Sequence, residues 1–220
     1  MSKGSLATLT AVVVAVVVAF GVAAPTGSAS RPLINRACFE APSTANTGAP
    51  SSAFLSMLGV LRRPQRPSDD LELSLLSHVG EGVYVNYIRL ARVVAGTSYY
   101  LIPVAKPNCS GPEELLLNER SPGGFASYGG ATAAHIADGK LFGTCCKGPT
   151  AVVAGVVPDR VAKVSITYPK SGRLHAVTIT TKPVENVFVV TVPRESTVAA
   201  VPKSVIWRSA KGKVIKTTHG

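Results

Sequence analysis

Six short runs rich in β-branched residues decide how this chain is interpreted: AVVAGVV (151–157), VAKVSITY (161–168), LHAVTIT (174–180), VFVVTV (187–192), SVIW (204–207) and KVIK (213–216). Valine, isoleucine and threonine favour strands, and turn residues bound each run. In the second run Val164, Ile166 and Tyr168 share one face while polar residues occupy the other, the period of a strand with one wet side. We therefore predict a small antiparallel β domain over 151–220.

Two glycine-closed segments separate neighbouring runs. PKSG (169–172) and SAKG (209–212) have the composition of tight turns, and each is expected to close a hairpin. Short strands with turns about every dozen residues favour a sandwich or a partly open barrel. Trp207, the single tryptophan, is expected to anchor the core of this domain rather than to stack on a ligand.

The first 29 residues have the composition of an export signal. Lys3 precedes an uncharged, Val- and Ala-rich run over 6–24, and small residues before Ser30 suit a signal peptidase. We expect cleavage near Ala29. The run approaches the roughly 18 to 20 residues that span a bilayer, so an uncleaved anchor stays open as an alternative. With either outcome, the rest of the chain is expected to be secreted or held in the cell envelope, outside the cytoplasmic membrane.

The cysteines are interpreted in the light of export. Cys38, Cys109, Cys145 and Cys146 form an even set, which in an oxidising compartment predicts two disulfides. A bond between the neighbours Cys145 and Cys146 needs a strained ring. The two other pairings both tie Cys38 and Cys109 to that pair, and both stay open. A metal site with His135 lacks any CxxC or HxxxH spacing, so no metal and no cofactor is expected.

Between the leader and the β domain, we predict a linker over 30–50 and a disulfide-tied α+β segment over 51–150. The fold class expected for the whole chain is α+β, with a helix and strand segment followed by an antiparallel β-sandwich-like domain. A helix is expected to begin after Ser51 and to end at Pro64. Asp69 and Glu72 suggest a capping box at a second helix start.

Other parts of the 51–150 segment are less regular. Residues 83–95 fit a helix or a strand, whereas 98–104 are predicted to be a strand. The glycine-rich stretch 122–130 is interpreted as a loop, without the strand and helix context of a nucleotide-binding loop. The basic segment 62–66 is interpreted as a solvated connector.

Five quoted segments carry a resemblance: GTSYYLIP (96–103), VVPDRVAKV (156–164), VENVFV (184–189), VIWR (205–208) and GKV (212–214). On these segments the chain resembles uncharacterised secreted proteins of high-GC Gram-positive bacteria with a "VPDGV…NVF…W…DxxGKV" tail. The resemblance covers about half of the mature chain. It implies export and a domain layout, and no activity. Arg160 stands where that pattern has glycine, a departure that would be costly if the position required a positive φ.

The positive charge is concentrated in the β domain. Residues 31–150 hold 11 Lys and Arg against 9 Asp and Glu, whereas 151–220 hold 11 against 3, within a total of +11. A basic domain outside the membrane encounters anionic lipid headgroups and wall polymers. Lysines on wet strand faces also keep sheet edges soluble, which is the competing explanation. Candidate surface-binding residues are Lys163, Lys170, Arg173, Lys182, Arg208, Lys211 and Lys213.

The functional expectation is an exported, non-enzymatic envelope or extracellular protein that binds an anionic surface or a protein partner through the basic β domain. Nucleic acid is disfavoured because aromatic residues are not interleaved on the polar faces. The alternative is a secreted hydrolase with a site between His78 and Cys146. That alternative has no GxSxG or HExxH motif to support it, although a triad assembled in space leaves no such motif.

Overall fold

The structure, a computed structural model, describes residues 43–76, 79–107, 109–147, 150–170, 175–193 and 202–219, all within a unit that spans 34–220. The described part is mostly β. Its strands form a six-stranded, a four-stranded and a three-stranded sheet, and apart from β1 with β2 the paired strands are antiparallel. In the described part, no helix has the length and apolar character needed to cross a membrane.

The six-stranded sheet has the order β1-β2-β4-β5-β6. The sixth strand, β3, pairs with residues 97–101 of β4, whereas β2 pairs with residues 104–107 of that strand. Its strands are β1 (Ala45–Asn46), β2 (Gly80–Tyr84), β3 (Arg89–Val94), β4 (Thr97–Pro107), β5 (Glu114–Ser121) and β6 (Gly124–Ala131). The three-stranded sheet, β11-β8-β7, contains β7 (Phe142–Lys147), β8 (Thr150–Val156) and β11 (Val187–Pro193). The four-stranded sheet, β10-β9-β12-β13, contains β9 (Lys163–Tyr168), β10 (Val177–Thr181), β12 (Ser204–Arg208) and β13 (Val214–His219).

The three-stranded sheet contributes to two cores, one on each face. Along β8, Val152 and Ala154 belong to the first core, whereas Ala151 and Val153 belong to the second. β11 alternates in the same way, with Val187 and Val189 in the first core and Phe188 and Val190 in the second. Strands that are buried on both faces are apolar throughout, which explains why AVVAGVV and VFVVTV show no polar alternation.

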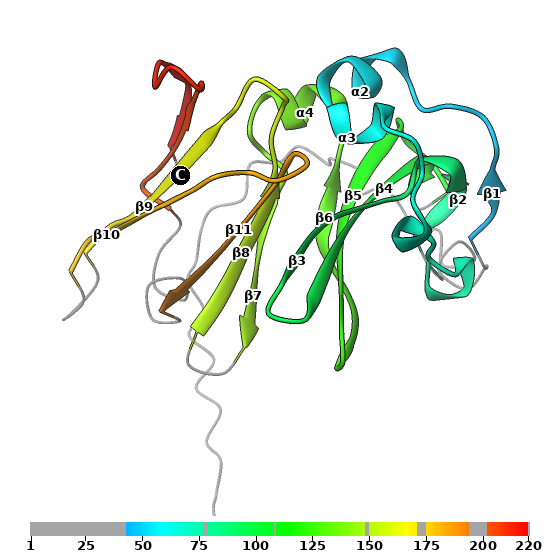
Figure 1. Ribbon diagram of the computed structural model, residues 1–220, viewed down its shortest axis with the longest axis horizontal. Coiled ribbons are helices and arrows are strands. Elements are labelled where there is room, and N and C mark those ends of the chain that lie inside the picture. The colour runs from blue at the N-terminus through cyan, green and yellow to red at the C-terminus, as the bar shows by residue number, and fades with distance from the viewer. Residues whose placement is uncertain are drawn as a thin grey trace, which may run out of the picture. The chain divides into compact units, whose positions relative to one another are not determined.

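The first core lies between the three-stranded sheet, the six-stranded sheet and three short helices. Those helices are α2 (Ser52–Met57), α3 (Gly59–Arg62) and α4 (Ala133–Ala137), and they contribute Phe54, Leu61 and Ile136 to it. β6 lies beside β7 and β3 beside β11, so the strands of the two sheets follow one another around this core. Figure 1 shows the three helices together near one end of these strands.

Two further cores complete the described part. The second core joins the three-stranded sheet to the inner face of the four-stranded sheet through Val164, Ile166, Tyr168 and Trp207. The third core lies between strands β2, β4 and β5 and the 3-10 turns η2 (Leu73–Leu76) and η3 (Val85–Tyr87). A further 3-10 turn, η1 (Pro67–Asp69), precedes η2. The predicted boundary near residue 150 therefore falls between β7 and β8, which pair with each other.

Local predictions in the C-terminal third are confirmed. Each of the six runs contains a strand, and the β9-β10 and β12-β13 pairs are the predicted hairpins. Val164, Ile166 and Tyr168 are buried while Lys163 is exposed. Trp207 is 2% exposed and packs in the second core, as expected of an anchor.

Predictions in the 51–150 segment were confirmed in part. The strand predicted over 98–104 is present within β4, but the glycine-rich stretch is not a loop and forms strand β6. No helix begins at Asp69, because its carboxylate binds Arg63 and two backbone N–H groups rather than forming a cap with Glu72. Residues 83–95 are strand, 3-10 turn and strand. The helix predicted before Pro64 is present as α2 and α3, which are separated at Leu58.

Arg160 stands where the resembling proteins have glycine, but it does not have a positive φ. The described non-glycine residues with positive φ are Ala95, Cys109, Glu185 and Asn186. Arginine is therefore tolerated at this position without backbone strain.

Gly139 and Gly212 provide a matched pair of substitutions. Their φ angles are +75° and +79°, a region in which a side chain costs about 1–2 kcal/mol. A Cβ on Gly139 would lie 3.1 Å from Cζ2 of Trp207, whereas nothing lies within 4 Å of a Cβ on Gly212. We expect Gly139→Ala to lower the free energy of unfolding more than Gly212→Ala in urea titrations. Equal losses would show that Trp207 does not restrict this turn.

Candidate functional site

Five of the seven predicted surface-binding residues lie at one end of the four-stranded sheet. Lys163 on β9 is opposite Arg208 on β12. Thr181 of β10 pairs with Val164, which places the next residue, Lys182, beside Lys163. Lys211 and Lys213 lie in the turn that follows β12. We call this group the basic end: Lys163, Lys182, Arg208, Lys211 and Lys213.

The side chains of the basic end are solvated cations. The four lysines are exposed, and Arg208 is partly buried and donates from Nη1 to the carbonyl oxygen of Gly212 at 3.2 Å. None of the five is in an ion pair with a carboxylate of the described residues. The charges therefore remain available to an external anion.

The remaining predicted residues lie elsewhere. Lys170 follows β9 at the opposite end of the sheet, where Lys203 precedes β12, and Arg173 lies outside the described residues. Lys216 on β13 is paired with Asp138, its Nζ lying 2.8 Å from Oδ1. Between the two ends, neighbouring hydroxyls bond across the β9-β10 pair, at 2.9 Å for Ser165 with Thr180 and 3.0 Å for Thr167 with Thr178.

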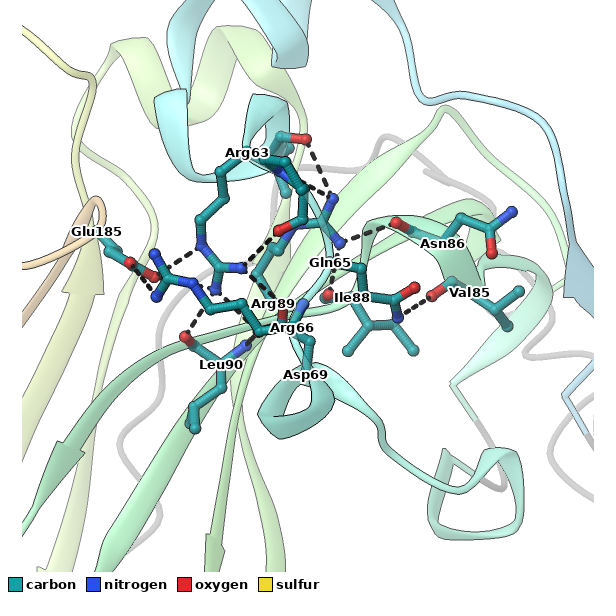
Figure 2. Close-up of polar contacts among 12 residues, drawn as sticks. Arg63, Gln65, Arg66, Asp69, Val85, Asn86, Ile88, Arg89, Leu90 and Glu185 are labelled. Atoms are coloured by element: carbon teal, nitrogen blue, oxygen red, sulfur yellow. Dashed lines mark hydrogen bonds and ion pairs between the residues drawn. The ribbon is translucent and has the colours of Figure 1, made fainter.

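A second charged group, centred on Asp69, was not predicted. The Asp69 side chain is fully buried and accepts hydrogen bonds from Arg63 Nη1 at 2.6 Å and from Arg63 Nη2 at 2.8 Å. The backbone N–H groups of Arg66 and Leu90 donate to it at 2.7 and 2.8 Å. Burial alone would raise the pKa of Asp69, but these four donors together hold that pKa below its ordinary value. Figure 2 shows the arrangement.

Glu185 is the second carboxylate of this group. It accepts a hydrogen bond from Arg63 Nε at 3.1 Å and pairs with Arg66 Nη1 at 2.9 Å. Glu185 and Asn186 have φ angles of +45° and +68° and lie between Val184 and Val187, whose N–H and C=O groups bond reciprocally at 2.9 Å. This is the geometry of a type I′ turn, which glutamate rarely adopts. The two arginines hold Glu185 in it.

Asp159 and Asn186 bind the beginning of α3. The N–H of Gly59 donates to Oδ1 of Asp159 at 2.6 Å, and the N–H of Val60 donates to Oδ1 of Asn186 at 3.1 Å. The first N–H groups of a helix have no partner within the helix, so these side chains satisfy them. Arg62 also pairs with Asp159 at 2.7 Å. Residues from the C-terminal third therefore cap a helix of the 51–150 segment.

The interpretation of 62–66 as a solvated connector was wrong for Arg63. Its side chain is 13% exposed and joins Asp69 to Glu185. Sequence reasoning missed this group because Glu185 lies 122 residues from Arg63, and no local pattern connects them. The local signal was the arginine cluster followed by Asp69, which lies six residues after Arg63 and forms its shortest ion pair.

The cysteine and histidine predictions are tested only in part. Cys109 is disulfide-bonded. Cys38 and the side chains of Cys145 and Cys146 lie outside the described residues, so both pairings stay predictions.

His78 also lies outside the described residues, and His135 is an exposed residue of α4. Burial raises the pKa of Glu114, and the nearby His135 opposes that rise. Among the described side chains, no three of His, Cys, Asp or Glu are grouped as a metal site would require.

The basic end is thus a solvated concentration of charge, whereas the Asp69 group is a largely buried one. Comparisons of the chain with protein-family models, with curated proteins and with solved structures found no match.

Proposed function

We propose that this chain is an exported, non-enzymatic protein of the cell envelope or extracellular space that binds an anionic polymer or surface through the basic end. The observation that carries the proposal is the strand register, which aligns Lys163 with Arg208 and brings Lys182, Lys211 and Lys213 to the same end. Residues spread over 50 positions of sequence thereby form one cationic surface.

The chemistry of the basic end suits a polyanion better than a single small anion. Lysine is a compact charge on a flexible stem, which adapts to repeated charges rather than fixing one group in a bidentate geometry. Solvated cations raise the local concentration of an oppositely charged polymer, and salt screens them over about 10 Å. The hydroxyls on the neighbouring strand face add hydrogen-bonding partners for a hydrated polymer.

Two features support the compartment and the finer fold in this proposal. The leader-like composition of 1–29 and the disulfide at Cys109 suit an oxidising compartment. The second core, which the three-stranded and four-stranded sheets share, suits a β-sandwich-like module, and with the helices of 51–150 an α+β class. Nucleic acid is not part of the proposal, because Tyr168 and Trp207 are buried rather than displayed beside the cations.

Co-sedimentation with isolated cell envelopes tests the proposal. The purified full-length chain is expected to bind at low salt and to be released steeply as salt is raised, because its contacts are between solvated charges. Binding that does not depend on salt would indicate a protein partner held by other contacts. An absence of binding at low salt would contradict the proposal and leave the lysines as determinants of solubility.

A further inference from the structure

A groove of about 560 Å³ lies apart from the basic end, between the segment before α2, the end of α3 and the turn η3. Small-molecule sites in proteins commonly have volumes of about 300–1,000 Å³. Apolar side chains of Leu55 and Leu61 line one part of this groove. Its polar lining includes Asn86, Arg62, Arg63 and Arg89.

Arg89 is the unusual residue of this lining because it is only 3% exposed. Its Nη1 donates to the carbonyl oxygens of Asn86 and Ile88, each at 2.8 Å, and its Nη2 donates to those of Arg63 at 2.9 Å and Leu61 at 3.5 Å. The guanidinium lies 5.6 Å from the centre of the Tyr87 ring. The buried Nε has no hydrogen-bond partner. The side chain is thus fixed in place with one donor unused.

The positive charge of Arg89 has no contacting counter-charge among the described residues. The two nearby carboxylates, Asp69 and Glu185, are bound by Arg63 and Arg66. Burial lowers the pKa of Arg89; Asp69 opposes that effect from a distance, and Arg63 reinforces it. Buried charges in proteins are normally paired, since removing an isolated charge from water is costly. No acidic side chain lines the groove, and its other two arginines are paired with Asp159, Asp69 and Glu185, so Arg89 contributes its uncompensated charge.

We propose that this groove binds a small molecule that carries a carboxylate on a compact apolar body. The carboxylate faces Arg89, whose charge is the one in this lining without a contacting carboxylate among the described residues, since Arg62 is paired with Asp159 and Arg63 with Asp69. The apolar body rests on the partly exposed Leu55. A carboxylate fits better than a phosphate because few donors remain free: most guanidinium N–H groups of Arg63 and Arg89 are already bonded within the protein. The inference does not depend on the function proposed for the basic end.

Benzoate and its neutral analogue benzamide serve as probes on the purified full-length chain. Calorimetric titration is expected to give benzoate a Kd of about 1 mM or tighter and benzamide at least tenfold weaker binding. The Nε–H resonance of Arg89 is expected to shift with benzoate in the same concentration range. Equal binding of the two probes, or no binding of benzoate in this range, would overturn the proposal.

Two variants locate the binding. Ala49→Phe places a ring in the groove from an exposed position without altering any arginine, and it is expected to weaken benzoate at least tenfold. Lys211→Gln/Lys213→Gln removes two charges from the basic end and is expected to leave benzoate affinity unchanged. If Ala49→Phe bound benzoate normally, or the double lysine variant lost binding, the site would not be this groove.

Discussion

A fragment containing only residues 151–220 is expected to lack a cooperative unfolding transition, although it contains all six of the predicted strands. In the intact chain β8 and β11 contribute Val152, Ala154, Val156, Val187 and Val189 to the first core, whose other members come from residues 54–141. Fully burying a valine contributes about 1.5–3 kcal/mol, so four exposed valines would remove about 6–12 kcal/mol. A domain's whole stability is only about 5–15 kcal/mol.

Circular dichroism during heating and the dispersion of amide resonances measure this outcome. The full-length chain is the control and is expected to unfold in a sharp transition. A fragment that melts as sharply and shows dispersed resonances would demonstrate that the second core suffices, and that the first core is not required by β8 and β11.

Replacing Asp69 by asparagine is expected to lower the free energy of unfolding by about 3–5 kcal/mol, the range found when one partner of a buried ion pair is removed. The variant leaves Arg63, whose side chain is 13% exposed, with only Glu185 as a charged partner. Asp70→Asn is the matched control, because this neighbouring carboxylate is exposed and is expected to change stability by less than about 0.5 kcal/mol. Urea titration measures both. Equal effects at the two positions would contradict the role assigned to Asp69.

The same carboxylate gives stability a defined pH dependence. The pKa of Asp69 is lowered in the folded protein from its ordinary value of 3.8. Its contribution is therefore fully present above that ordinary value and is lost as pH falls through the lower, folded pKa. Wild-type stability is expected to fall with acid more steeply than that of Asp69→Asn. If the free energies of unfolding of the wild type and of Asp69→Asn fell in parallel with decreasing pH, Asp69 would not titrate with a lowered pKa.

The strands of the C-terminal third could be predicted because their signals are local. The alternation at Val164, Ile166 and Tyr168, and the glycine that closes the β12-β13 turn, each lie within a few residues of sequence. The assignment of those strands to two sheets could not be predicted, since the apolar runs of β8 and β11 do not reveal which core each residue enters. The core that each of these residues enters is determined by the pairing of β8 with β7 and by packing against residues 54–141.

β6 was missed because the close approach that requires one of its glycines arises only in the folded protein. A Cβ on Gly130 of β6 would lie 2.5 Å from Cδ2 of Leu116 on β5, and a Cβ on Gly143 of β7 would lie 2.6 Å from the carbonyl oxygen of Tyr128 on β6. Glycine in a strand marks such close approach, yet in sequence it is typical of loops. Gly130 therefore allows β5 and β6 to lie close together, and Gly143 does the same for β6 and β7.

The candidate sites also differ in how far the sequence could predict them. The lysines of the basic end were found from charge alone, and the strand register then selected five of the seven. The ion pairs of Asp159 with Arg62 and of Glu185 with Arg63 were not found, because their partners are 97 and 122 positions apart in the sequence. The groove at Arg89 was not found, because its lining comes from several separate segments between Thr47 and Arg89. Charge composition indicates that a surface is basic, but only the fold shows which cations lack a counter-charge.

The most direct test of the proposed function compares the two ends of the four-stranded sheet. Lys211→Gln/Lys213→Gln removes two charges from the basic end, and Lys170→Gln/Lys203→Gln removes two from the opposite end, so net charge is matched. Affinity for isolated cell envelopes at one low salt concentration is the measurement. The account predicts a clear loss for the first variant and near wild-type binding for the second. Equal losses would contradict it, since binding would then follow net charge and not the basic end.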